Sequence, residues 1–177
     1  LNQFEKVLDH CDLVSYSSKT NPYVTKILEK ETPCFFSVHL VNELVNIEDC
    51  SRVLFLAQAW NEEEISYLLS LEIKHLVVDN LRDLDVLEKY LLKFPETRVE
   101  LLLRLKLKER SIRTEKYFVF GIETEMVDKK VKELKSWPQI ESIGIHFHRK
   151  TQNMAEWNYG FELAELFDKE FFESIDL

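Results

Sequence analysis

Short apolar runs alternate with amphipathic stretches along nearly the whole chain. The first run begins at Leu13 and leads up to Lys19, and Asn21-Pro22 then ends the strand and starts a helix that extends to about Glu31. Five more apolar runs have the length of strands, and several are apolar on both faces, as parallel strands are. The further predicted strands are 33–38, 53–59, 75–79, 99–105 and 140–148.

The segments between these runs have the spacing of amphipathic helices. An amphipathic helix is predicted at 1–11, and the segment 39–44 leads into another short one. Three helices are predicted to begin at asparagine caps, at Asn61, Asn80 and Asn153. The helix after Asn61 has the apolar stripe Ile65, Leu68 and Leu69, and the helix after Asn80 has Leu84, Leu87, Leu91 and Phe94. The helix before the sixth strand has Val127, Val131 and Leu134, and the helix after Asn153 has Trp157, Phe161, Ala164 and Phe167.

Strand and helix therefore alternate six times, which predicts an α/β fold with parallel strands and right-handed connections. The candidates are a doubly wound sheet and a TIM-type barrel. No Gly-x-Gly-x-x-Gly follows the first strand, which favours the barrel. A complete barrel needs eight units and about 250 residues. With 177 residues and an apparent seventh strand entrance at 174–177, we expect residues 1–177 to be one incomplete barrel domain.

Composition narrows the possible functions. Hydrophobic residues make up 45% and charged residues 31% of the chain, as in globular proteins with a buried core. The net charge of −9, without a basic stripe, argues against a nucleic-acid partner. No apolar run approaches a membrane span, and the start lacks a signal-peptide pattern. The three cysteines lack metal-ligand spacing, so we expect reduced thiols and a cytoplasmic protein.

Lys19 is the first candidate for chemistry. A lysine at the end of a strand places an amine at the carboxyl edge of the sheet, where ligands bind in α/β folds. Such an amine can form a Schiff base with a carbonyl cofactor. Most lysines in this position are simply solvated, and the position alone leaves both interpretations open.

The segment 16–22 resembles the Tyr-Ala-x-Lys-Ala-Asn motif of the pyridoxal-phosphate-dependent decarboxylases of the alanine-racemase fold type, which act on ornithine, arginine, diaminopimelate and related amino acids. The resemblance implies that Lys19 is catalytic and carries pyridoxal 5'-phosphate as an aldimine. It also places Tyr16 among the cofactor-binding residues. Because the family binds this cofactor in a TIM-type barrel, the resemblance supports the predicted fold.

Arg104 interrupts the most apolar strand in the chain. A charge there needs a partner or an anion, and a surface carboxylate at the strand end is one alternative. The segment 102–105 resembles a family segment whose arginine lies deep in the barrel near the cofactor. The resemblance therefore makes Arg104 a cofactor-binding residue.

His146 and His148 alternate along one strand and are expected on the same face. They could ligate zinc or iron, as in metal-dependent barrel hydrolases, or form ordinary hydrogen bonds, but no accompanying metal-ligand pattern exists and we expect no metal. The segment 144–152 resembles the family's Gly-x-x-x-His-x-Gly-Ser-Gln. That resemblance implies that His148 stacks on the pyridine ring, as a catalytic and cofactor-binding residue, and that Thr151 helps to hold the phosphate.

Several positions depart from the family motifs. The segment 37–44 resembles Asp-x-x-Ser-x-x-Glu-Leu and keeps Glu43, but Ser37 and Leu40 replace the acid and the serine. The segment 119–122 resembles Lys-Phe-Gly with Val119 in place of lysine, and two cations replace the apolar-Gly pair after His148. The two cations are Arg149 and Lys150.

The resemblance implies the N-terminal barrel part of an amino-acid decarboxylase, a lyase of polyamine or lysine biosynthesis. The chain stops before the family's glycine-rich phosphate loop, the acidic partner of the pyridine nitrogen and the C-terminal β domain. We therefore expect this chain alone to be inactive, and the full-length protein to be a homodimer acting on a small amino acid. The alternatives are a non-catalytic single-barrel carrier of pyridoxal phosphate, a catalytically inactive regulatory homologue, and a metal-dependent hydrolase that uses His146 and His148.

Overall fold

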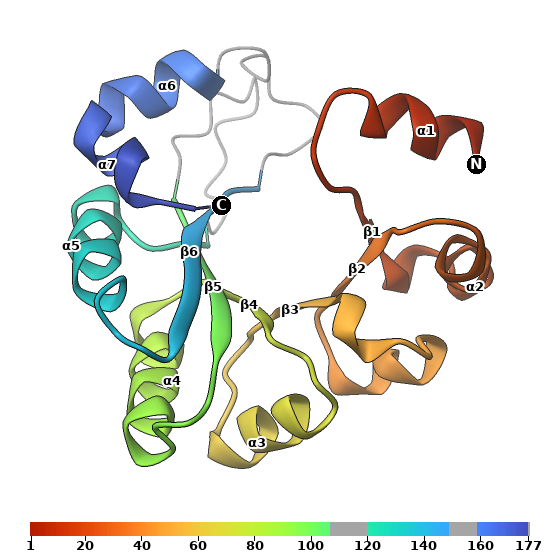
Figure 1. Ribbon diagram of the computed structural model, residues 1–177, viewed down its shortest axis with the longest axis horizontal. Coiled ribbons are helices and arrows are strands. Elements are labelled where there is room, and N and C mark those ends of the chain that lie inside the picture. Colours follow the sequence, from red (N-terminus) through yellow and green to blue (C-terminus); the bar gives the residue numbers. More distant parts are fainter. Residues whose placement is uncertain (107–119, 149–158, 177) are drawn as a thin grey trace, which may run out of the picture. The chain divides into compact units, whose positions relative to one another are not determined.

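Six strands form one sheet in which neighbours follow the order of the chain (Figure 1). The computed structural model describes residues 1–106, 120–148 and 159–176. The pairs β1–β2, β2–β3 and β5–β6 are parallel, as the alternation of strands and helices predicts. The strands are β1 (Ser15–Ser17), β2 (Phe35–Val38), β3 (Val53–Leu56), β4 (His75–Val78), β5 (Val99–Arg104) and β6 (Ile140–His146).

The chain divides into two compact units, 1–76 and 77–177, with the boundary inside β4. The helices of the first unit are α1 (Asn2–Leu8), α2 (Pro22–Glu31) and α3 (Glu62–Ser70), with 3₁₀ turns η1 (Ser18–Thr20), η2 (Val41–Asn46) and η3 (Cys50–Arg52). The described helices of the second unit are α4 (Leu81–Lys93), α5 (Thr124–Leu134), α6 (Tyr159–Leu166) and α7 (Lys169–Ser174).

In the first unit, one face of the sheet is buried and apolar. Phe36 and Val38 of β2 are fully buried, whereas the alternate residues Phe35 and Ser37 are partly exposed on the other face. Arg52 ties the segment before β2 in place, because its guanidinium donates to the carbonyl oxygens of Glu29, Thr32 and Cys34. The guanidinium also lies 5.4 Å from the ring centre of Phe36.

In the second unit, β5 shows strict alternation between a buried and a partly exposed face. Val99, Leu101 and Leu103 are fully buried, and Arg104 belongs to the other face. Figure 1 shows α4 and α5 on the same side of β5 and β6. The apolar stripes of these helices are buried as the sequence predicts, and consist of Leu84, Leu87 and Leu91 in α4 and Val127, Val131 and Leu134 in α5.

Asparagine caps begin three helices. The side-chain oxygens of Asn21, Asn61 and Asn80 accept backbone N–H groups at 3.0, 2.9 and 2.9 Å. The capping predictions for Asn61 and Asn80 are therefore confirmed. The cap predicted at Asn153, like Trp157, lies outside the described residues.

Several element boundaries differ from the predictions. The third strand ends at Leu56 and does not extend to Ala59, whose positive φ of 56° a strand does not accommodate. The sixth strand ends at His146 instead of His148. The stripe of the last predicted helix ends at Phe167, and the structure adds a further helix, α7, which Asp168 caps by accepting the N–H of Phe171 at 2.8 Å.

The segment after α7 lies beside β6. The N–H of Asp176 donates to the carbonyl of Ile143 at 2.8 Å, and the N–H of Ile143 donates to the Asp176 carboxylate at 3.1 Å. Lys135, which directly follows α5, forms an ion pair with the same carboxylate at 3.2 Å. Within the described ranges, no helix is both long and apolar enough to cross a membrane.

Candidate cofactor site

Lys19 lies in the turn that joins β1 to α2, at the carboxyl end of the strand. The strand ends at Ser17, η1 carries the lysine, and Asn21 then caps α2, whose first residue is Pro22. The side chain is exposed. Over the described part of the chain its ammonium group has no hydrogen-bond or ion-pair partner. The predicted place of Lys19 in the fold is confirmed, whereas its role stays a prediction.

The residue before the lysine is held from a different part of the first unit. Ser18 is only 1% exposed, and its hydroxyl donates to Oε2 of Glu43 at 3.0 Å. Oε1 of Glu43 accepts the N–H groups of His39 and Leu40 at 3.3 and 3.1 Å. This carboxylate therefore already has three donors. It anchors the turn that carries Lys19 (η1, Ser18–Thr20), which we call the lysine turn, to the turn after β2.

Hydroxyl groups line the partly exposed face of β1 and β2. Ser15 and Ser37 share a hydrogen bond of 2.7 Å, and Ser17 lies opposite Ser37 in the register. Ser37 stands where the resembled motif has an acid, so this face carries hydroxyls in place of a carboxylate. Tyr16 is half-buried, and strand alternation places it on the opposite face from Ser15 and Ser17.

In the second unit, Arg104 ends β5 with its side chain only 16% exposed. Its Nη1 lies 3.9 Å from Oδ2 of Asp79, whose side chain is 13% exposed. Burial lowers the pKa of the Arg104 guanidinium, and the Asp79 charge opposes that change. One alternative from the sequence was a surface carboxylate as the partner of Arg104, whereas the observed carboxylate, that of Asp79, is largely buried. The cofactor-binding role of Arg104 stays a prediction.

The Arg104 guanidinium is incompletely hydrogen-bonded. Its buried Nε has no hydrogen-bond partner among the described residues, and the ion pair with Asp79 is long. The ring of Phe120 lies 5.6 Å from the guanidinium carbon. The cation therefore retains donors for an anionic or carbonyl oxygen.

A glycine fixes the backbone beside Arg104. Gly121 has a φ of +128°, and a Cβ atom there would lie 2.7 Å from the backbone nitrogen of Lys106. The next residue, Ile122, donates its N–H to the carbonyl of Arg104 at 2.7 Å. Sequence reasoning assigned no role to this glycine, although the motif match at 119–122 was a signal for it; Val119 lies outside the described residues.

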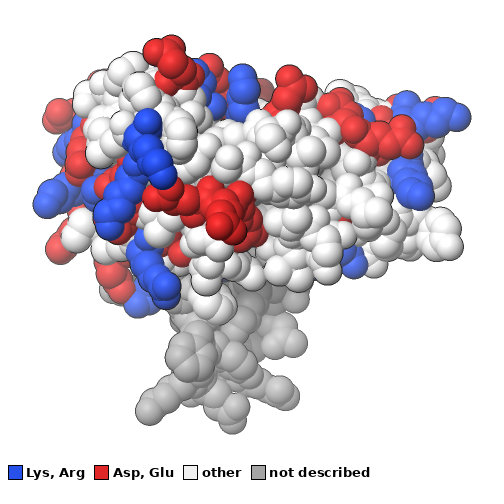
Figure 2. All heavy atoms as spheres, turned by 90° about the horizontal axis from the view of Figure 1, so that it is seen from below, with Lys and Arg blue, Asp and Glu red and all other residues white. Residues whose placement is uncertain are grey.

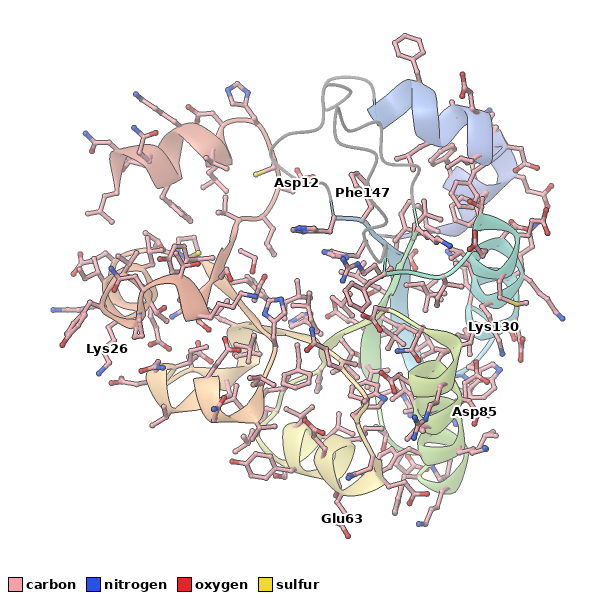
Figure 3. All side chains as sticks on the ribbon, turned by 180° about the vertical axis from the view of Figure 1, so that it is seen from behind. Asp12, Lys26, Glu63, Asp85, Lys130 and Phe147 are labelled. Carbon is pink, nitrogen blue, oxygen red and sulfur yellow. The ribbon has the colours of Figure 1, made fainter. Side chains whose placement is uncertain are left out.

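The two histidines differ in their surroundings. His146 is the last residue of β6, is half-buried and lies opposite Arg104 in the register. His148 is exposed and lies two residues beyond the strand, after Phe147, which Figure 3 labels. Arg149, Lys150 and Thr151 lie outside the described residues. Among the residues that the structure describes, no group of three or more His, Cys, Asp or Glu side chains could hold a metal ion.

Each unit offers residue types that can bind a cofactor group. In the first unit, the Lys19 amine has no partner among the described residues and can react with a carbonyl group. In the second unit, the buried Nε of Arg104 has no hydrogen-bond partner within the described ranges and suits an oxygen acceptor.

Comparison with protein-family models decides the class. Residues 2–163 match the family of pyridoxal-dependent decarboxylases, in its pyridoxal binding domain. The chain belongs to this family. Its cofactor is therefore pyridoxal phosphate, as the sequence predicts. No curated protein matched the chain.

Solved structures show the same fold. Lysine decarboxylase from Selenomonas ruminantium is 15% identical with a TM-score of 0.71, and the match covers 99% of this chain and 47% of that one. Arginine decarboxylase from Paramecium bursaria Chlorella virus is 16% identical with a TM-score of 0.67, covering 98% and 46%. Lysine/ornithine decarboxylase from Vibrio vulnificus, complexed with putrescine, is 22% identical with a TM-score of 0.63, covering 86% and 40%.

These matches confirm the predicted α/β, TIM-type fold. The chain spans less than half the length of the three solved relatives. The activity and substrate of a whole protein are therefore treated as proposals below.

Proposed function

We propose that this chain is the cofactor-binding part of an amino-acid decarboxylase, in which the Lys19 amine binds the aldehyde carbon of pyridoxal phosphate. The observation that carries this proposal is the place of Lys19. It is an exposed amine without a partner among the described residues, at the carboxyl end of β1 in a domain of a pyridoxal-binding family. When bound, the cofactor supplies an electron-withdrawing ring that stabilises the negative charge left by loss of carbon dioxide.

The roles of the other candidate residues follow from the motif resemblance. His148 would stack on the pyridine ring, and Thr151 would contribute to phosphate binding. Arg104 would donate its remaining N–H groups to an oxygen of the cofactor, which its unpaired Nε supports. Tyr16 would lie near the lysine as a neighbour in sequence, two residues before η1.

Reductive labelling tests the role of Lys19. The chain is mixed with pyridoxal phosphate, reduced with borohydride, digested and mapped by mass spectrometry. We expect one predominant adduct, on Lys19, and its loss in Lys19→Ala. The matched control is Lys26→Ala, because Figure 3 shows Lys26 on the outer side of α2 and its side chain is exposed. Labelling spread evenly over the exposed lysines would contradict the proposal.

For the whole protein, we propose decarboxylation of an amino acid that carries a second amino or guanidino group, such as lysine, ornithine, arginine or diaminopimelate, by a cytoplasmic homodimer. The support is the family to which the chain belongs, together with the solved diaminopimelate, lysine/ornithine and arginine decarboxylases that share its fold. Release of carbon dioxide from each carboxyl-labelled amino acid tests this for the full-length protein. We expect turnover of at least one of the four, and none by residues 1–177 alone. Turnover by residues 1–177 alone would contradict the proposal that this chain is only the cofactor-binding part of the enzyme.

A non-catalytic carrier of pyridoxal phosphate is the second candidate. The hydrogen bond between Ser15 and Ser37 favours it, because Ser37 replaces the acid of the resembled motif. A full-length protein that labels at Lys19 but releases no carbon dioxide from any of the four amino acids would support the carrier. Carbon dioxide release would exclude it.

A further inference from the structure

Ser18 belongs to none of the roles that the motif resemblance assigns. It is nevertheless the most buried residue of the lysine turn, at 1% exposure, and its hydroxyl donates to Glu43 Oε2 at 3.0 Å. A buried hydroxyl bound to a carboxylate forms a charge-assisted hydrogen bond, which is stronger than a bond between neutral groups. This bond fixes the residue directly before Lys19.

Glu43 is itself held firmly. Its other oxygen accepts two backbone N–H groups, from His39 and Leu40, at the start of η2. The lysine turn follows β1, and η2 follows β2, its parallel neighbour. The Glu43 carboxylate therefore connects the turns at the ends of two neighbouring strands. Because both oxygens are occupied, Glu43 acts as an anchor for the backbone.

Lys19 needs such an anchor because its own side chain has none. No hydrogen bond or ion pair within the described residues restrains its amine, so the direction of the side chain depends on its backbone. On the other side of the lysine, Asn21 caps α2 by accepting the N–H of Tyr23 at 3.0 Å. The lysine therefore lies between two fixed points, Ser18 and Asn21.

We infer that Ser18 and Glu43 are positioning residues that direct the Lys19 amine toward the aldehyde of the cofactor. The inference rests on the proposed function of Lys19. Correct placement of a reacting amine raises its rate with a bound aldehyde far more than with a freely diffusing reagent. Loss of the hydrogen bond between Ser18 and the side chain at position 43 is expected to lower the rate at Lys19 by roughly tenfold.

The test measures pyridoxal phosphate labelling at two lysines of the same molecule. Borohydride is added after increasing times, and the ratio of the Lys19 adduct to the Lys26 adduct is determined by peptide mapping. Lys26 is exposed on α2 and reports the intrinsic reactivity of a surface amine. The variants are Ser18→Ala, Glu43→Ala and Glu43→Gln. Ser51→Ala is the matched control, because Ser51 also donates to a carboxylate, that of Asp49 at 2.6 Å, but away from the lysine turn.

We expect Ser18→Ala and Glu43→Ala to lower the ratio roughly tenfold, with no further loss in the double variant, because the two residues act through one bond. Glu43→Gln should keep most of the ratio, since its amide can accept the backbone N–H groups and donate to the Ser18 hydroxyl. Ser51→Ala should leave the ratio unchanged. A labelling ratio that is lost in Glu43→Ala but kept in Glu43→Gln would show that the hydrogen bonds of Glu43 matter for Lys19, and that its charge does not.

The outcomes separate this inference from the proposed function. Predominant labelling of Lys19 in the wild-type chain, with an unchanged ratio in Ser18→Ala, would overturn the inference and leave the proposed function intact. Equal losses in Glu43→Gln and Glu43→Ala would show that the charge acts and would also overturn it. Even labelling of the wild-type lysines would overturn both.

Discussion

At the scale of single residues, the Arg104–Asp79 pair places two opposite charges in a largely buried part of the second unit. Both side chains are more than four-fifths buried, and their charged atoms are 3.9 Å apart. A buried charge without its partner has a large desolvation cost. Asp79 also accepts a hydrogen bond of 2.7 Å from the side chain of Asn80, which holds the carboxylate in place.

Asp79→Ala should therefore destabilise the chain by about 2 kcal/mol, because it leaves the Arg104 charge without an acid partner. The measurement is the midpoint of urea unfolding. The control is Asp85→Ala, which removes an exposed ion pair with Lys89 at 2.6 Å and should cost less than about 1 kcal/mol. Equal losses in the two variants would show that the Arg104–Asp79 pair is not energetically special.

The sequence predicted that a charge on β5 needs a partner, but it could not identify Asp79. Arg104 and Asp79 are separated by a helix and a strand in the chain, and only the pairing of elements brings them together. Lys19 was easier to predict, because its place depends on a local strand-to-helix turn with a Pro22 signal. The bond between Ser18 and Glu43 again joins distant segments, and no local pattern shows it.

At the scale of elements, the turn at Gly121 links the end of β5 to the segment before α5. Ile122 exchanges backbone hydrogen bonds with Arg104 and Lys106, at 2.7 and 3.0 Å. Gly121 allows this contact, because it has a positive φ and no side chain against the backbone of Lys106. The chain has only three glycines, and at position 121 the backbone conformation requires a glycine.

Gly121→Ala should lower the free energy of unfolding by about 2 kcal/mol, through both backbone strain and the contact with Lys106. The measurement is again urea unfolding. Gly160→Ala is the matched control, because a Cβ atom at Gly160 meets nothing within 4 Å and the residue lies in helix α6. A neutral result for Gly121→Ala would contradict the backbone argument.

Apolar periodicity predicted element types well, and their ends less well. The stripes of α4 and α5 are buried as predicted, because a helix of that spacing has one way to face a core. Helix α7 was not predicted, although Phe171 continues the apolar spacing of Phe167 and their ring centres lie 3.8 Å apart. Asp168, which caps this helix, was the local signal for it.

At the scale of the molecule, α/β order and the family could be predicted from sequence, because both depend on features repeated along the whole chain. The individual cofactor contacts of His148 and Thr151 remain predictions. His148 is exposed beyond the end of β6, and Thr151 lies outside the described residues. The alternation of side chains along 140–148 predicted a strand that reaches His148. The strand ends at His146 because its pairing with β5 ends there, opposite Arg104.

The segment after α7 contributes a pH-dependent part of the stability. The N–H of Ile143 and then Lys135 hold the pKa of Asp176 below its usual value of 3.8. A lowered pKa in the folded state means that ionised Asp176 stabilises the fold above the unfolded pKa, and that this stabilisation disappears as the pH falls through the folded pKa. Asp176→Ala should therefore be less stable than wild type at pH 7.

The measurement is the unfolding midpoint of both proteins from pH 7 down to the acid limit of folding. The difference between them should narrow as the pH falls below the unfolded pKa of about 4. Asp128→Ala is a useful comparison, because Asp128 has an exposed ion pair with Lys132 at 3.0 Å and, within the described ranges, its carboxylate accepts no backbone N–H group. If the unfolding midpoints of wild type and Asp176→Ala differed by the same amount at every pH, ionised Asp176 would not be the source of the stabilisation.

The order of the strands has a consequence for how the chain is made. Each strand of the sheet pairs with the strand that was synthesised just before it. The lysine turn, β2 and the Glu43 anchor can therefore assemble while the residues after 76 are still in or on the ribosome, since N-terminal segments become available first. The amine proposed to capture the cofactor would then be in its working orientation on a nascent chain, before the strand that carries Arg104 has been translated.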